Sequence, residues 1–236
     1  MMHDKTVANS YIVVVSTCPR AGADYLPDTL AALDREGAAD LRKVVLSDGT
    51  LATKCDWPVR VREPAARSTR ANLWDAFRLA VEAGAERLLY FEDDIVPCKN
   101  AIARMLAVEC PERAALLSFH DKKRRLRRAH GLHLAPARDI DRAGFWGLQA
   151  VSIPRRTLEY LVTKDPYSVW RFNVARHGDR AVEEFVVRSP WPRVAYHVPS
   201  LVRHVGVVSA AHPDRFRPNR HVPETYMGDD FDAMSL

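Results

Sequence analysis

Cysteine is scarce in this chain, and no two cysteines stand at the short spacing of a metal or redox motif. The four cysteines, Cys18, Cys55, Cys98 and Cys110, are spread over 236 residues. A structural zinc site or a redox dithiol needs cysteine pairs a few positions apart, so neither is expected. We predict four reduced thiols, the usual state in a cytosolic protein.

Long apolar runs are absent as well. The run YIVVVS is too short for the apolar region of a signal peptide, and no positively charged segment introduces it. No stretch approaches the roughly 20 apolar residues that cross a bilayer. We therefore expect a soluble, cytoplasmic protein without a membrane span.

Basic residues are in excess. The formal net charge is +5 and the pI about 9.1, which favours an acidic partner such as a nucleotide, a phosphate-rich acceptor or a nucleic acid. Hydrophobic residues make up 47% of the chain, enough to fill one sizeable core. No internal repeat or low-complexity linker divides the sequence, so we expect one domain over residues 1–236.

Hydrophobic patterning in the first half predicts strands that alternate with helices. The segments YIVVVS, KVVLS and ERLLYFE have the continuous apolar character of strands buried on both faces, and PVRVRE alternates like a more exposed strand. Helices are predicted between them, one with Leu26, Leu30 and Leu33 on one face and one over NLWDAFRLAVEAGA. The alternation predicts an α/β, Rossmann-like fold with a mainly parallel central sheet and helices on both faces.

The second half is less regular. We expect a helix at about 100–108, a strand in AALLSF, and helices in RRTLEYLV and DRAVEEFVVR. The stretch RVAYHVPSLVRHVG is expected to form a late strand or turn, and residues 211–236 are expected to run over the surface as a tail.

Three predicted strands end in polar clusters, at residues 17–20, 47–49 and 92–94. In sheets of this kind ligands bind in the crevice beyond the carboxyl ends of the strands, so we expect these clusters to converge on one site. The third cluster, Glu92-Asp93-Asp94, holds adjacent carboxylates that repel one another unless a positive group lies among them. Mg²⁺ and Mn²⁺ prefer such oxygen ligands, although a solvated turn would also explain the cluster.

The ordered set YIVVVSTCPR, VVLSDGT and RSTRANLWDAFRLAVEAGAERLLYFEDDIVP resembles the nucleotide-sugar half of a GT-A-fold glycosyltransferase of the family 2 type. In that family an Asp-x-Asp motif ends the fourth strand and binds Mn²⁺ or Mg²⁺ together with the donor diphosphate; here it reads Glu-Asp-Asp. The resemblance implies a donor half at about 10–97 and an acceptor half at about 98–210. On family grounds the donor would be a UDP-sugar.

The resemblance also implies roles for individual residues. Asp94 would be the main metal ligand, with His204 as a late ligand of the metal or the diphosphate. The residues placed against the nucleotide sugar are Thr17, Pro19, Arg20, Asp48, Arg67, Asn72, Glu92 and Asp93.

These residues also have ordinary structural explanations. Arg20 and Arg67 could be surface charges, and Asp48 could stabilise the turn that follows it. Asn72 could cap a helix, and His204 could be a structural histidine among apolar neighbours.

A base is required if sugar transfer inverts the anomeric configuration, and a carboxylate close to the acceptor is the usual one. We predict Asp179 as the base, with Glu183 one helical turn further along as the second choice. The alternative is that Asp179 caps the helix and Glu183 is exposed. Acceptor contacts are expected from Trp146, Gly147 and Gln149 in GFWGLQA, since glycines allow close approach and a Trp ring can stack on a sugar or base; the alternative is that Phe145 and Trp146 belong to the core.

The run DKKRRLRR, which includes Lys122, Lys123, Arg124 and Arg125, is either a solvated segment or a patch that binds a polyanion. The acceptor would therefore be a glycan or a polyanion such as hydroxymethylated DNA. A rival hypothesis is a non-catalytic nucleic-acid-binding protein, but that leaves the acidic cluster without a purpose because carboxylates repel phosphates. A nucleotidyltransferase is disfavoured because STCPRAGADY, after the first strand, has a single glycine where that class carries a Gly-rich phosphate loop.

Overall fold

The structure is a computed structural model that describes residues 10–20, 23–51, 53–63, 69–121, 130–137, 148–164, 178–207, 223 and 225–236; for residues 69–70 and 178–180 it describes the backbone only. All four cysteines fall within these ranges, and no disulfide links them, as expected. None of the helices in the described ranges has the length and apolar character needed to cross a bilayer.

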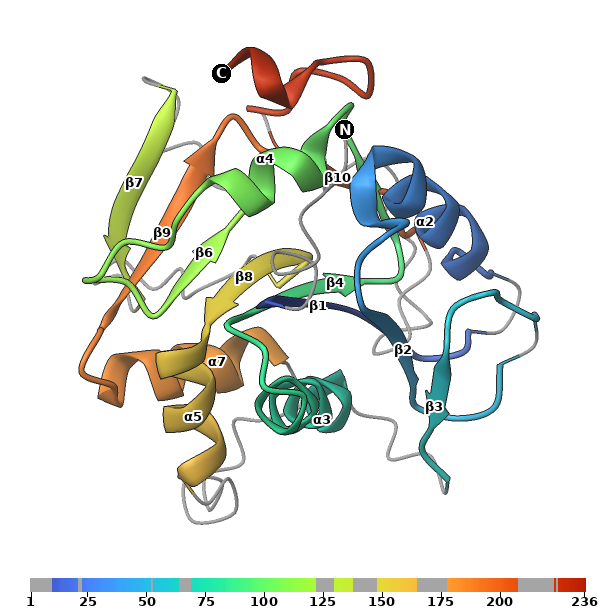
Figure 1. The fold of residues 1–236 in the computed structure, drawn as a ribbon, viewed down its shortest axis with the longest axis horizontal. Helices are drawn as coiled ribbons and strands as arrows, with labels where there is room; N and C mark the ends of the chain where they lie inside the picture. Colours follow the sequence, from blue (N-terminus) through green and yellow to red (C-terminus); the bar gives the residue numbers. More distant parts are fainter. Residues whose placement is uncertain are drawn as a thin grey trace.

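An eight-stranded mixed sheet forms the centre of the fold, in the order β3-β2-β1-β4-β8-β6-β9-β7 (Figure 1). Its strands are β1 (Tyr11–Thr17), β2 (Lys43–Ser47), β3 (Val59–Val61), β4 (Arg87–Glu92), β6 (Leu116–Ser118), β7 (Gly131–Pro136), β8 (Ala150–Pro154) and β9 (Arg193–Val198). The four strands of the first half are mutually parallel, as predicted. Strand β8 runs antiparallel to its neighbours β4 and β6, and the edge strand β7 runs antiparallel to β9.

Helices cover both faces of the sheet, which confirms the predicted fold class (Figure 1). One face carries α3 (Thr69–Glu82), α5 (Arg155–Thr163) and α7 (Gly178–Arg188). The other carries α2 (Leu26–Leu33), which continues into a π-helical turn at Asp34–Ala38, and α4 (Ala101–Ala107). Within this turn Gly37 kinks the backbone with φ 118°, a left-handed conformation that glycine adopts without strain.

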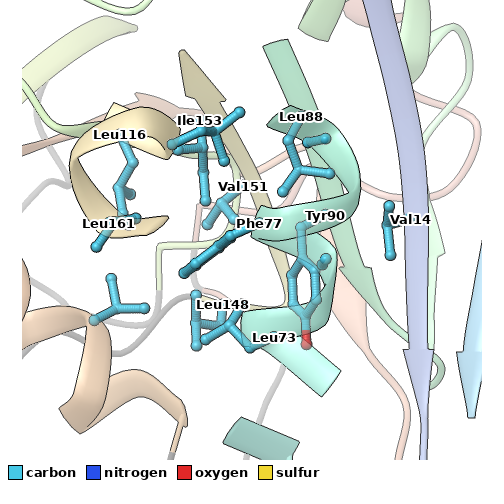
Figure 2. Close-up of a cluster of buried hydrophobic side chains, with 14 of the residues drawn as sticks. Val14, Leu73, Phe77, Leu88, Tyr90, Leu116, Leu148, Val151, Ile153 and Leu161 are labelled. Carbon is cyan, nitrogen blue, oxygen red and sulfur yellow. The ribbon is translucent and has the colours of Figure 1, made fainter. Parts of the chain in front are cut away.

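The core beneath α3 shows why the apolar spacing of this helix matters. Leu73 and Phe77 lie one turn apart, are nearly inaccessible to solvent, and point toward side chains from β4 and β8 (Figure 2). Tyr90 and Val151 come from those two neighbouring strands. Truncating a buried Phe to Ala typically costs about 3–5 kcal/mol, so Phe77 fixes α3 firmly on the sheet.

A second, two-stranded sheet was not anticipated. The predicted late strand RVAYHVPSLVRHVG divides into β9 and a short β10 (Val202–His204), and β10 pairs antiparallel with β5 (Ile95–Pro97). The register sets His204 opposite Ile95, and the amide of Val205 donates to the carbonyl of Asp94 at 2.8 Å. This ribbon brings the late histidine to the acidic cluster.

The described part of the C-terminal tail, residues 225–236, is attached to the body of the protein. Arg203 of β10 forms an ion pair with Asp229 through two hydrogen bonds of 2.7 and 2.8 Å. Asn100, just before α4, donates to Asp232, and Ala233 is fully buried against the apolar cluster on that face. Met227 and Met234 remain exposed.

Candidate active site at the carboxyl edge of the parallel strands

The parallel register brings the polar strand ends together. Ser16 of β1 is paired with Glu92 of β4, and Thr17 is paired with Ser47 of β2. The amide of Asp48 donates to the carbonyl of Thr17 at 3.0 Å. The predicted convergence of the three clusters is therefore correct, and it follows from strand pairing alone.

Arg20 and Asp93 form a buried ion pair at the centre of this edge. The guanidinium donates from Nη1 and Nη2 to the two carboxylate oxygens, each at 2.7 Å. Thr17 also donates its hydroxyl to Oδ2 of Asp93. The side chains of Arg20 and Asp93 are only 10% and 4% exposed, so Arg20 is not a surface charge.

Asp94 lies beside this pair and makes different contacts. Its Oδ2 is 3.0 Å from Nε2 of His204 and accepts from Nη2 of Arg20 at 3.2 Å. Its Oδ1 is buried and has no hydrogen-bond partner within the described ranges. A Cβ atom at Gly206 would lie 2.1 Å from Oδ2, so this backbone must remain without a side chain to approach the carboxylate.

The ligand atoms of Glu92, Asp94 and His204 all lie within 4.8 Å of one another. Two carboxylates and an imidazole suit Mn²⁺, and they tolerate Mg²⁺. Buried acceptors in proteins normally have a hydrogen-bond partner, whereas Oδ1 of Asp94 has none in the described part of the chain, so its lone pairs are available to a metal ion. These residues therefore fit a divalent ion. Gln149 donates to Oε2 of Glu92 at 3.1 Å and orients that carboxylate.

Burial and charge act in opposite directions on the two aspartates. For Asp93, burial is the largest influence and raises the pKa, against the lowering effect of Arg20. For Asp94, burial would also raise the pKa, but the hydrogen bond and charge of His204, together with Arg20, outweigh it and lower the pKa. Burial disfavours the charged form of Arg20, yet the carboxylates around it hold its pKa above the ordinary value.

Asn72 and Asp48 occupy the next strand end along the sheet. Asn72 is in the first turns of α3 and is buried; its amide donates to the carbonyls of Thr17 and Leu46, both at 3.0 Å. It therefore holds the ends of β1 and β2 together and does not begin the helix. Asp48 is buried, with one oxygen 4.0 Å from Nε of Arg62.

The remaining predicted site residues are less closely joined to this cluster. Pro19 is exposed in the loop after β1. Glu183 is 2% exposed within α7, so the alternative of an exposed Glu183 is wrong. Asp179 is the second residue of α7, and its side chain lies outside the described residues. The other predicted residues outside the described ranges are Arg67, Lys122, Lys123, Arg124, Arg125, Trp146 and Gly147.

Two residues of the site were not expected from the sequence. Gly206 supports Asp94 by its lack of a side chain, and Tyr25 packs its ring 5.4 Å from the guanidinium carbon of Arg20. The hydroxyl of Tyr25 accepts from the amide of Val207 at 3.1 Å, which ties the loop before α2 to the segment after β10. The glycine that follows His204 in RHVG is the one signal in the sequence that could have pointed to Gly206. No local sequence pattern indicates that Tyr25 contacts Arg20.

The acidic cluster and His204 thus lie at the carboxyl edge of the parallel strands, which is where open α/β sheets bind their ligands. No family model matches this chain, and neither does any curated protein. Several solved structures do. One is a glycosyltransferase involved in the glycosylation of the major capsid of PBCV-1, with 13% identity and a TM-score of 0.52 over 86% of this chain and 96% of that one.

Two further solved structures are similar at lower TM-scores. A mannosyltransferase from Pyrobaculum calidifontis, in complex with GDP-Man and Mn²⁺, has 14% identity and a TM-score of 0.48; the match covers 80% of this chain and 57% of that one. A protein from STIV has 16% identity and a TM-score of 0.46 over 92% of this chain and 97% of that one. At these identities the likeness concerns the fold, and the PBCV-1 glycosyltransferase shares that fold with this chain.

Proposed function

We propose that this protein is a divalent-metal-dependent glycosyltransferase of the GT-A type, which moves a sugar from a nucleotide-sugar donor to an acceptor hydroxyl. The observation that carries the proposal is the group formed by Glu92, Asp94 and His204, with its unpartnered carboxylate oxygen, at the ligand-binding edge of the sheet. The fold shared with the PBCV-1 glycosyltransferase supports the same class.

Glu92, Asp94 and His204 would hold Mn²⁺ or Mg²⁺, which supplies charge stabilisation for the leaving diphosphate. Asp93, which Arg20 and Thr17 hold in place, would approach the ribose or the sugar. Asp48, directly after β2, would accept a hydrogen bond from the base or the ribose. The ends of the parallel strands would form the floor of the nucleotide pocket. We propose a UDP-sugar as the donor.

The proposed base is Asp179, with Glu183 as the second candidate. Both belong to α7, whose Val182, Phe185 and Val186 pack against the sheet and give the helix a fixed position. A carboxylate on a firmly packed helix can be held at the short distance that proton removal from an acceptor hydroxyl requires.

The acceptor side would be formed by the loops that follow β6 and precede β8. Gln149, already bonded to Glu92, links this side to the metal ligands. Trp146, Gly147 and the basic residues Lys122, Lys123, Arg124 and Arg125 belong to the same proposed surface, for a glycan or a polyanion such as hydroxymethylated DNA.

A thermal-shift experiment tests the proposal. UDP, GDP, ADP and CDP are each added with and without Mn²⁺, and one nucleotide is expected to raise the Tm only when the metal is present. Mass spectrometry of the protein incubated with a panel of nucleotide sugars should then show slow donor hydrolysis. Salt-sensitive DNA binding with no nucleotide-dependent shift would instead favour the nucleic-acid-binding class.

A further inference from the structure

A fixed positive charge lies inside the proposed metal site. Arg20 bonds both oxygens of Asp93, and its Nη2 also reaches Oδ2 of Asp94 at 3.2 Å. That oxygen belongs to a proposed metal ligand and is 3.0 Å from His204. Because a guanidinium does not lose its proton in proteins, this charge is permanent.

The position of Arg20 is determined from several sides. Its side chain is 10% exposed, and the ring of Tyr25 packs against the guanidinium. The hydroxyl of Tyr25 is in turn bonded to the segment that follows His204. Arg20 is therefore held among the carboxylates by a buried ion pair and by an aromatic ring, and that ring is itself bonded to the segment after His204.

Simple electrostatics then predicts that a divalent ion and Arg20 disturb each other. With a neutral imidazole, the formal charges of Glu92, Asp93, Asp94 and Arg20 sum to −2, and without Arg20 they sum to −3. At separations of a few ångströms in a partly buried site, one unit of charge changes the affinity for a dication by an order of magnitude or more. A metal ion that takes Oδ2 of Asp94 also competes directly with Nη2 of Arg20.

We propose that Arg20 is a built-in counter-ion that makes the divalent metal and the nucleotide diphosphate bind cooperatively. This inference rests on the proposed function. A metal ion that binds without nucleotide must compete with Arg20, which is already bonded to the carboxylates of Asp93 and Asp94. A diphosphate that binds without metal is repelled by the net negative charge of the site. Together, the metal takes Oδ2 of Asp94, and the diphosphate accepts the hydrogen bond that Nη2 of Arg20 then no longer gives to Asp94, while Arg20 stays paired with Asp93. Such coupling is reciprocal, so each ligand raises the affinity for the other by the same factor.

Isothermal titration calorimetry with Mn²⁺, UDP and GDP tests this on the intact protein. Mn²⁺ is titrated alone and in the presence of each nucleotide, into the wild type and into Arg20→Gln. The matched control is Arg60→Gln, because Arg60 is exposed on β3 and its loss changes the net charge equally. Arg20→Lys retains the charge without the two-pronged pairing.

For Arg20→Gln we expect Mn²⁺ alone to bind at least about tenfold more tightly than to the wild type. The gain in Mn²⁺ affinity on adding nucleotide should shrink by a similar factor. Arg60→Gln should behave like the wild type, and Arg20→Lys should keep the weak binding of Mn²⁺ alone.

If a folded Arg20→Gln variant binds Mn²⁺ no more tightly than the wild type does, the inference about Arg20 is wrong, whereas the proposed metal site still stands. If neither protein binds Mn²⁺, the metal-dependent function itself is wrong. If Arg20→Gln does not fold, the wild type still decides the matter: a coupling factor below about three between Mn²⁺ and both nucleotides contradicts the proposal.

Discussion

Gly206 lies so close to Asp94 that a Cβ atom on the glycine would stand 2.1 Å from Oδ2 of the carboxylate. Backbone and carboxylate are therefore in direct contact at the proposed metal site, where Val205 also bonds the carbonyl of Asp94. The contact is non-local, because it joins the bend between β4 and β5 to the segment after β10.

Replacing Gly206 by Ala should displace the Asp94 carboxylate, because the added methyl group has no room. We expect Mn²⁺ binding to weaken by at least about tenfold, with a small loss of Tm from the strained contact. Calorimetry and thermal unfolding measure the two effects. Val207→Ala, which adds no atom to the same segment, serves as the control; equal effects in both variants would contradict a specific contact with Asp94.

Asp94→Asn should abolish nucleotide-dependent stabilisation by Mn²⁺ while the protein remains folded. The amide keeps the size of the carboxylate but removes the charge that a hard cation prefers. The difference in Tm with and without Mn²⁺ and nucleotide is the measurement. Asp40→Asn, an exposed position beyond the π-helical turn, is the matched control. A persistent shift in Asp94→Asn would show that the metal binds elsewhere.

Asn72→Leu should lower the free energy of unfolding by about 1–3 kcal/mol, since two buried carbonyls lose a hydrogen-bond donor. Urea denaturation measures this directly. Glu82→Ala, exposed near the end of the same helix, should change stability by no more than about 0.5 kcal/mol. A similar small effect for Asn72→Leu would mean that the two strand ends are held by pairing alone.

Asp229 provides a pH-dependent prediction. The hydrogen bonds from Arg203 are the largest influence on Asp229 and lower its pKa, with a further bond from Tyr226 at 2.6 Å. A carboxylate whose folded pKa is lowered stabilises the protein above its ordinary pKa of about 3.9, and this stabilisation disappears as the pH falls through the folded value. The stability difference between the wild type and Asp229→Asn should therefore be present at pH 7 and shrink below about pH 4. Urea unfolding of both proteins at pH 7 and below about pH 4 tests this. A difference in the free energy of unfolding that is the same at the two pH values would contradict it.

Asp179→Asn should leave donor and metal binding unchanged and remove sugar transfer if Asp179 is the base. Glu183→Gln is the parallel test of the second candidate, and Glu184→Gln on the same helix is the control. Binding is measured by calorimetry and transfer by mass spectrometry of the acceptor. Transfer at the wild-type rate in Asp179→Asn would rule this residue out.

Much of the fold could be predicted from local pattern. Strands β1, β2 and β4 were evident from continuous apolar runs, and α3 from the repeat of Leu73 and Phe77, because burial on a sheet imposes that spacing. Strands β7 and β8, and the pairing of β5 with β10, were not predicted. The ribbon strands are three residues long, and their pairing depends on segments far apart in the chain.

The candidate site was predictable in part for the same reason. The acidic cluster and Arg20 could each be identified as unusual residues at strand ends. That Arg20 pairs with Asp93, and that Asn72 joins two strand ends, depends on three-dimensional packing that no local pattern encodes. Gly206 matters only because of a contact with Asp94, so its role becomes visible only in the structure.

The ribbon of β5 and β10 also bears on when the proposed metal site can be completed during synthesis of the chain. Glu92 and Asp94 leave the ribosome long before His204, and the parallel half of the sheet can assemble around them first. The nascent chain then carries two of the three proposed metal ligands without the third. The proposed metal site would therefore be completed late in translation, after the part of the sheet that supports it.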